Sequence, residues 1–251
     1  MKIPIVKEYG SWAVFGCSCL AALFAGLMTR PWDSGGEFSL ITFMTIIGMI
    51  FLINAKVPFS SLLRARAFTE SGDSDTENRN TENSYWLLIF MIVGLGLLIP
   101  FLIDGFRYFI GFSILVISYS ILMKKGREHH LIAEINGFAL LTLSAPIIYF
   151  TVTGDVSMRI YAAVLIFFVA GVLKVRVRIK KTHLYRGTMV CYCLAAVVVF
   201  HLIHIPLILL VPLLENIISA IWMREVKLKT LGDIELTKGI IFIVLTGFFW
   251  K

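Results

Sequence analysis

Residues 172–187 read VLKVRVRIKKTHLYRG and lie between two long apolar segments of the chain. This stretch carries Lys and Arg residues in quick succession and contains no carboxylate. In multi-span membrane proteins, short loops with an excess of Lys and Arg lie on the cytoplasmic side. The stretch therefore indicates a loop between two membrane-spanning helices, and it helps to set the orientation of the whole chain.

The overall composition agrees with a membrane protein. Hydrophobic residues make up 58% of the 251 residues and charged residues 16%, whereas about a quarter of a typical soluble domain is charged. The apolar residues gather in runs of about 18–20, the length with which a helix crosses a hydrocarbon core. Because backbone groups in lipid must bond internally, we predict an all-α polytopic membrane helical bundle. About nine spans are expected, at residues 12–29, 36–54, 85–103, 106–123, 134–152, 157–174, 188–205, 207–223 and 235–250.

The distribution of positive charge predicts the orientation. With nine spans, 19 of the 23 Lys and Arg residues fall on one side of the membrane. This bias predicts a cytoplasmic N-terminus, an external C-terminus and a multi-pass protein of the bacterial cytoplasmic (inner) membrane. The net charge of +7 is then an orientation signal and a match to anionic lipids. Membrane lipids, especially anionic ones, are the expected partners, with a membrane protein complex as a further candidate, and nucleic acid is not expected.

We predict a single transmembrane domain over residues 1–251. Its only substantial hydrophilic segment joins the second and third spans. The first part, residues 56–66, is basic and amphipathic and is expected to form a short interfacial helix. Residues 67–84 are polar with few apolar side chains, so they are predicted to be a disordered cytoplasmic loop.

Several polar residues lie in or beside the predicted spans. Glu215 lies near the middle of the span at 207–223, where a charge is expensive and is expected to face the interior of the bundle, neutral or paired. Such a carboxyl either bonds to a neighbouring helix or handles protons or substrate. Further candidates at predicted cytoplasmic span ends, which with Glu215 could line one cavity, are Glu8, Asn54, Glu134 and Glu235.

The basic stretch also offers a candidate phosphate site. Lys174, Arg176 and Arg178 alternate with apolar residues, and this period of two predicts an extended segment with one basic face. Because arginine can bind phosphate with two parallel hydrogen bonds, these residues are candidates for phosphate or lipid binding, together with Arg64 and Arg66. The alternative is a polybasic anchor for anionic lipids.

No cofactor or metal is expected. Cys17 and Cys19, like Cys191 and Cys193, are two positions apart, which on a helix turns the two side chains to different faces. Neither pair is therefore placed to chelate one metal ion. His201 and His204 share a face, but the predicted spans offer no second helix with a histidine to complete a haem site.

Two short motifs carry a family resemblance. Residues 4–12, PIVKEYGSW, resemble the Pro-Lys-Glu-His-Gly-Ala-Trp opening of the YwiC-like bacterial membrane proteins. Residues 231–235, LGDIE, are similar to their Gly-x-x-Glu ending, and the basic stretch after the sixth predicted span also fits. The resemblance extends over the layout of the whole chain.

The predicted nine-helix layout also resembles that of UbiA-type prenyltransferases. The resemblance implies functional cytoplasmic loops after spans two and six, where those enzymes hold Mg²⁺ on aspartates. This chain has Lys56 in the first loop and Lys174, Arg176 and Arg178 in the second, so catalysis of that kind is not favoured. We expect a non-catalytic accessory, lipid-binding or partner-binding membrane protein. The alternatives are a divergent prenyltransferase or prenyl-diphosphate binder and a small-solute transporter.

Overall fold

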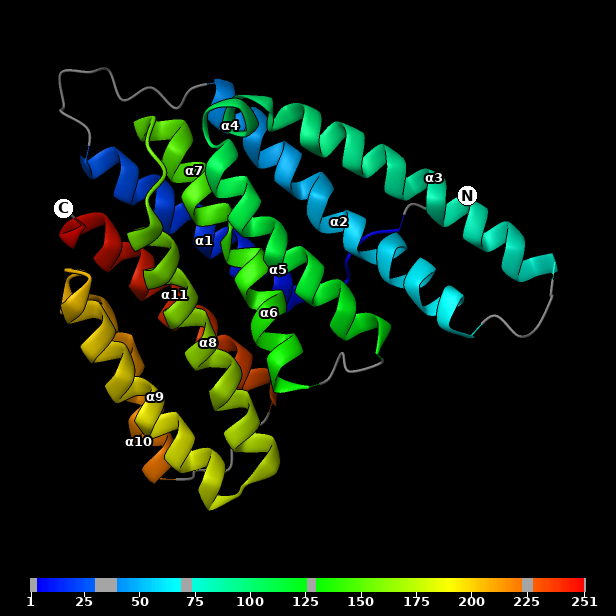
Figure 1. Ribbon diagram of the computed structural model, residues 1–251. Coiled ribbons are helices and arrows are strands. Elements are labelled where there is room, and N and C mark those ends of the chain that lie inside the picture. The colour runs from blue at the N-terminus through cyan, green and yellow to red at the C-terminus, as the bar shows by residue number, and fades with distance from the viewer. Residues whose placement is uncertain (1–3, 30–39, 69–73, 126–129, 223–227, 251) are drawn as a thin grey trace. The chain divides into compact units, whose positions relative to one another are not determined.

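The computed structural model describes residues 4–29, 40–68, 74–125, 130–222 and 228–250. Throughout these residues the regular elements are helices, without a strand (Figure 1). The all-α prediction is therefore confirmed.

Six of the described helical segments are long and apolar enough to cross a membrane. They are Tyr9–Thr29, Leu40–Leu63, Phe106–Lys124, Leu131–Thr153, Met158–Lys180 and His183–Leu202. The architecture is that of a polytopic membrane helical bundle, as predicted, but the number nine is not confirmed. One further segment, Leu207–Ile221, is apolar and shorter.

The contacts divide the chain into two compact units, and the single transmembrane domain stays a prediction. Unit 1 comprises residues 1–11 and 38–141, and unit 2 comprises residues 12–37 and 142–251. The helices of unit 1 are α2 (Leu40–Phe68), α3 (Ser74–Leu97), α4 (Ile99–Asp104), α5 (Phe106–Lys124) and, up to Leu141, α6 (Leu131–Thr142). Unit 2 holds most of α1 (Tyr9–Thr29), with α7 (Ser144–Thr153), α8 (Met158–Lys180), α9 (His183–Leu202), the 3₁₀ helix η2 (Leu207–Leu213), α10 (Leu214–Ile221) and α11 (Leu228–Phe249).

Two of the predicted spans are interrupted in the structure, each beside a proline. Pro100 lies in the first turn of α4 and Pro146 in the first turn of α7. Proline has no N–H to continue the helical ladder, but it is tolerated in the first turn of a helix. Each interruption therefore comes just before the proline, and a new helix begins there.

The hydrophilic segment between the second and third predicted spans also differs from the prediction. α2 continues without a break past Pro58 to Phe68, so residues 56–66 are the end of this helix. α3 begins at Ser74, so residues 74–84 are helical, although they were predicted to be disordered. A helix extends into a polar sequence more easily than it starts there, because nucleation is the costly step. Residues 69–73 lie outside the described residues.

In unit 1, α2 and α3 lie side by side along much of their length (Figure 1). Two glycines permit this close approach. A Cβ atom on Gly48 would lie 3.0 Å from the carbonyl oxygen of Gly94, and one on Gly94 would lie 2.7 Å from Leu52. Small residues at such positions let membrane helices pack through their backbones.

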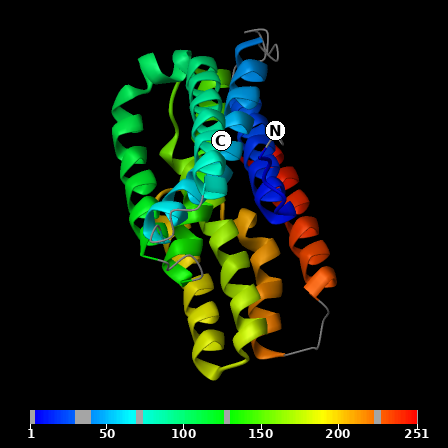
Figure 2. The ribbon, with the colours of Figure 1, turned by 90° about the vertical axis from the view of Figure 1, so that its right-hand side faces the viewer.

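In unit 2, α8 supplies much of the core. Ile160, Ala163 and Val164 on this helix are fully buried. Phe167 stacks on Phe242 of α11, with ring centroids 4.3 Å apart. α8, α9 and α10 pack against one another, as Figure 2 shows in yellow-green, yellow and orange. α8 is therefore packed among the other helices of unit 2, including α10 and α11.

A tight turn connects α9 to η2. His204 has a left-handed backbone with φ of 55°, and the N–H of Ile205 donates to the carbonyl of Phe200 at 2.8 Å. This is the pattern with which helices end in a Schellman motif, and Pro206 then prevents the helix from continuing. The carbonyl of His204 accepts a hydrogen bond from Arg159. Arg159 also lies over the ring of Trp250, 5.7 Å from its centroid, so this side chain joins three segments of unit 2.

Candidate functional site

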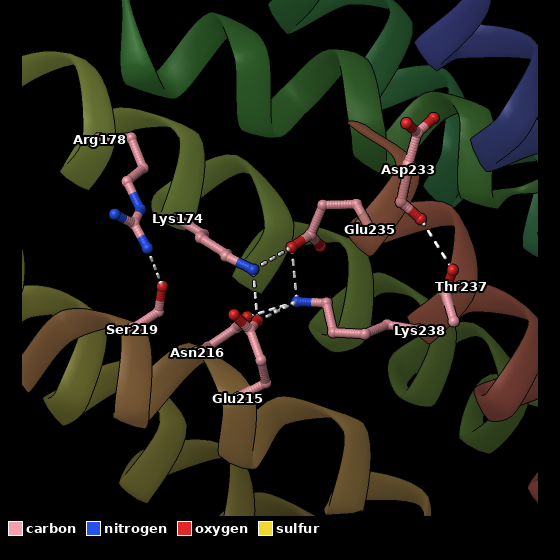
Figure 3. A network of polar contacts seen from close by, with 9 residues as sticks. All are labelled: Lys174, Arg178, Glu215, Asn216, Ser219, Asp233, Glu235, Thr237 and Lys238. Carbon is pink, nitrogen blue, oxygen red and sulfur yellow. Dashed lines mark hydrogen bonds and ion pairs between the residues drawn. The ribbon is translucent and has the colours of Figure 1, made fainter. Parts of the chain in front are cut away.

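Four charged side chains form a closed ring in unit 2 (Figure 3). Lys174 of α8 pairs with Glu215 of α10, and its Nζ lies 2.9 Å from Oε1 of Glu235 on α11. Lys238 of α11 closes the ring: its Nζ lies 2.6 Å from the same Glu235 oxygen and 3.3 Å from Oε2 of Glu215. Each lysine thus bridges both carboxylates, and the four formal charges cancel. These four residues are called the charge ring below.

The members of the charge ring differ in burial. The side chains of Lys174 and Lys238 are 2% and 6% exposed, whereas those of Glu235 and Glu215 are 24% and 39% exposed. A buried ammonium group needs acceptors on several sides, because all three of its hydrogens donate. Two shared carboxylates meet that need for each lysine. The ring is therefore closed on its lysine side and most open at Glu215.

Helical spacing aligns α8 with α10. Lys174 and Arg178 are four residues apart, and so are Glu215 and Ser219. Residues with this spacing lie on one face of a helix. Lys174 pairs with Glu215, and Arg178 donates a hydrogen bond to the hydroxyl of Ser219. Two parallel contacts therefore connect the helices, one turn apart (Figure 3).

Asn216 adds an amide to the charge ring. Its side chain is almost fully buried, and its Oδ1 accepts a hydrogen bond from Lys238. The orientation of this amide follows from chemistry, because an ammonium group only donates and must face the oxygen. The Nδ2 atom is buried and has no hydrogen-bond partner among the described residues.

Gly171 makes room for Glu235. It lies three residues before Lys174 on α8, and a Cβ atom there would lie 3.1 Å from Oε2 of Glu235. A side chain at this position would require the Glu235 carboxylate to shift by a few tenths of an ångström. The absence of a side chain at residue 171 thus lets α11 bring its acid against α8.

The basic stretch differs from its predicted conformation. Lys174, Arg176 and Arg178 belong to α8, which continues to Lys180, so the prediction of an extended segment with one basic face is wrong. On a helix, Lys174 and Arg178 share a face, while Arg176 points elsewhere. Of the two valines between them, Val177 is buried with the core face of α8 and Val175 is half-buried. The burial of Val177 in unit 2 suits a helix rather than a strand with one apolar face.

The predicted cavity residues fall into separate groups. Glu215 and Glu235 meet in the charge ring of unit 2, as described above. Glu8 and Asn54 lie in unit 1, where each joins the N-terminal segment to α2, and Glu134 lies in the first turn of α6. Arg64 and Arg66 belong to α2, but their side chains lie outside the described residues.

The N-terminal segment of unit 1 is attached to α2 by two side chains. The backbone N–H of Val6 donates to Oδ1 of Asn54 at 3.0 Å, and both residues are buried. Lys56 Nζ lies 3.1 Å from Oε2 of Glu8, and the same oxygen accepts a hydrogen bond from Ser11. Partial burial raises the pKa of Glu8, but the charge and hydrogen bond of Lys56 and the Ser11 hydroxyl outweigh it, so this pKa lies below its ordinary value.

Sequence reasoning missed Lys238, Asn216 and Ser219. Lys238 had a usable signal, because it stands inside the apolar run that begins after Glu235 and is three residues from that acid. A lysine within a membrane helix is expected to have a specific partner. Asn216 and Ser219 had no such signal, since uncharged polar residues are common in membrane helices.

Residues 5–149 match the family described as YwiC-like protein, and this range covers more than half of the chain. The chain belongs to the YwiC-like family. No curated protein and no solved structure matches it. The matched residues of this YwiC-like chain include the N-terminal segment that is attached to α2. The charge ring lies on the C-terminal side of the matched range.

Proposed function

We propose that this YwiC-like chain is a non-catalytic membrane protein that binds its ligand, a lipid or a small polar solute, at the charge ring of unit 2. The observation that supports this function is the arrangement of Lys174, Lys238, Glu215 and Glu235. Charges among membrane helices are expensive, and they commonly mark paths or sites for ions and polar ligands. The ring provides paired charges and an amide rather than a nucleophile beside a base, so binding suits it better than bond making.

The location and partners belong to the same proposal. The excess of Lys and Arg on one predicted side supports insertion in the bacterial inner membrane with the N-terminus in the cytoplasm. Basic residues at the end of α5, Lys124 and Lys125, would then lie near anionic lipid headgroups. Such lipids are the partners that we expect for this surface.

A matched pair of variants on α8 tests the proposed function. Lys174→Met removes a member of the charge ring, whereas Lys180→Met removes an exposed lysine near the end of the same helix. Native mass spectrometry of the protein in mild detergent would detect a mass that remains bound after purification. We expect the wild type and Lys180→Met to retain this ligand and Lys174→Met to lose it. Equal occupancy in all three proteins would contradict the proposed site.

A small-solute transporter is a second candidate, supported by the local structure before Glu215. The segment η2 is a 3₁₀ helix with Pro212 inside it, and α10 begins directly after it. A 3₁₀ stretch within a longer helical segment often marks a hinge. This junction lies one residue before the most exposed member of the charge ring. Prenyl-diphosphate binding has less support, because Arg176 and Arg178 lie on different faces of α8.

A further inference from the structure

Glu215 is the member of the charge ring that is best placed to move. Its side chain is 39% exposed, and both lysines contact it through the single oxygen Oε2. It is the second residue of α10, next to the junction with η2. Glu235, by contrast, is held against Gly171 and is less exposed. If one carboxylate leaves the two lysines, the structure favours Glu215.

The surroundings of Glu215 are rich in hydrogen-bond donors. Lys174 and Lys238 donate to it, and Asn216 is 1% exposed with an Nδ2 that has no partner among the described residues. A buried donor without an acceptor costs about 1–3 kcal/mol, so such groups are normally satisfied by water or ligand. The site therefore offers two ammonium groups to any acceptor that takes the place of Glu215, and a buried amide donor lies on the neighbouring residue.

The other charged groups near Glu215 belong to the helices packed around α10. α8 contributes Lys174 and Arg178, and α11 contributes Glu235 and Lys238. α9 contributes Cys193, which is buried. The sequence of η2, LILLVPL, has no titratable side chain. The charged groups at the site are thus the four members of the charge ring and Arg178.

We propose that the charge ring is a binding site for a small anionic group, a carboxylate or a phosphate, which replaces the Glu215 carboxylate on Lys174 and Lys238 when Glu215 takes up a proton. This inference rests on the proposed function, since it names the ligand class of the same site. The charge balance is simple. Protonation changes the ring from a net charge of zero to plus one, and a bound monoanion returns it to zero. Each monoanion is therefore bound together with one proton.

The binding of acetate and of inorganic phosphate to the purified protein tests this proposal. The protein would be placed in phosphatidylcholine nanodiscs, with sodium chloride at equal ionic strength as the control. Titration calorimetry in buffers of different ionisation enthalpy measures the protons taken up for each anion. We expect one proton for each acetate, and an affinity that rises up to tenfold for each unit by which the pH falls. Binding without proton uptake would overturn the proposal, and this measurement needs no variant.

Two variants test whether Glu215, rather than Glu235, is the carboxylate that the anion replaces. Glu215→Gln and Glu235→Gln both remove one negative charge from the charge ring, but only the first weakens the acceptor that is proposed to leave. We expect Glu215→Gln to bind acetate without pH dependence and at least tenfold more tightly than Glu235→Gln. Equal affinities would show that net charge alone controls binding, and the displacement of Glu215 would be wrong.

The source of the anion is decided by a second set of nanodiscs. The protein is first placed in nanodiscs that contain phosphatidic acid, in buffer without acetate or phosphate, and acetate is then titrated into the sample. If the lipid headgroup fills the site, the wild type should no longer bind the added acetate. If the site takes free solutes, it should still bind acetate. Either result supports an anion site. If Lys174→Met loses a co-purified ligand but the wild type takes up no proton with any of these probes, the proposed function stands and this inference fails.

Discussion

The ammonium group of Lys238 lies 2.6 Å from Oε1 of Glu235, one turn away on α11, and it reaches Glu215 on α10 at the same time. A pair within one helix would stabilise that helix by only about 0.2–0.5 kcal/mol. Because Lys238 and Glu235 also contact α10 and α8, the pair connects three helices. This connection makes the charge ring a feature of the tertiary structure rather than of one helix.

The loss of one ring lysine should destabilise the protein more than the loss of a matched pair of charges. Lys174→Met leaves two carboxylates with one lysine, and breaking a buried ion pair in this way typically costs about 3–5 kcal/mol. In the double variant Lys174→Met/Glu235→Gln the charges balance again, so part of that loss should return. Thermal unfolding in detergent, analysed as a double-mutant cycle, measures the coupling. Additive effects would show that the two groups do not interact.

Two glycines on α3 should respond differently to the same substitution. Gly94→Ala places a Cβ atom 2.7 Å from Leu52 of α2, whereas nothing lies within 4 Å of a Cβ atom on Gly96. We expect Gly94→Ala to destabilise unit 1 by about 1–3 kcal/mol through overpacking. Gly96→Ala should be neutral or stabilise by up to about 1 kcal/mol, because alanine favours the helix. If Gly94→Ala lowers the melting temperature less than Gly96→Ala does, the close packing of α2 on α3 is contradicted.

The ion pair between Glu8 and Lys56 should stabilise the protein only above acidic pH. Because the pKa of Glu8 is lowered in the folded state, this contribution is complete above its ordinary pKa of about 4.3 and is lost as the pH falls through the lowered value. The side chains are largely exposed, so the effect of Glu8→Gln at pH 7 is expected to be about 0.5 kcal/mol or less. Melting temperatures of the wild type and Glu8→Gln should converge as the pH falls below about 4. If the difference between the two melting temperatures grows as the pH falls, the ion pair does not stabilise the protein in the way predicted.

The orientation is testable with single cysteines in a background where the four native cysteines are replaced by alanine. Asp75→Cys is expected to react with a membrane-impermeant maleimide only after permeabilisation, and Lys251→Cys is expected to react in spheroplasts without it. The reason is the strong bias of Lys and Arg toward the side that carries residue 75. Labelling of both positions from the same side would mean that an even number of spans lies between residues 75 and 251, whereas seven are predicted there.

The conformation of the basic stretch shows where local sequence patterns fail. Lys174 to Lys180 alternates with valine and isoleucine, which is the period of a strand. The structure makes it the end of α8, because Val177 packs within unit 2 and the backbone bonds internally, while Ile179 stays exposed. The alternation shows which residues are apolar, but it does not show which side of the segment neighbouring helices will bury.

The sequence by itself determined that the chain is an all-α membrane protein, because long apolar runs leave the backbone no other way to satisfy its hydrogen bonds. It also identified Glu215 as a carboxyl within a span, Glu235 as a candidate at a span end and Lys174 as a candidate for phosphate or lipid binding. Only the tertiary structure decided that these residues meet, and that Lys238, Asn216 and Gly171 complete their surroundings. The reason is physical: the partners stand on helices that are far apart in sequence, and the crossing of α8, α10 and α11 alone brings opposite charges within reach of one another.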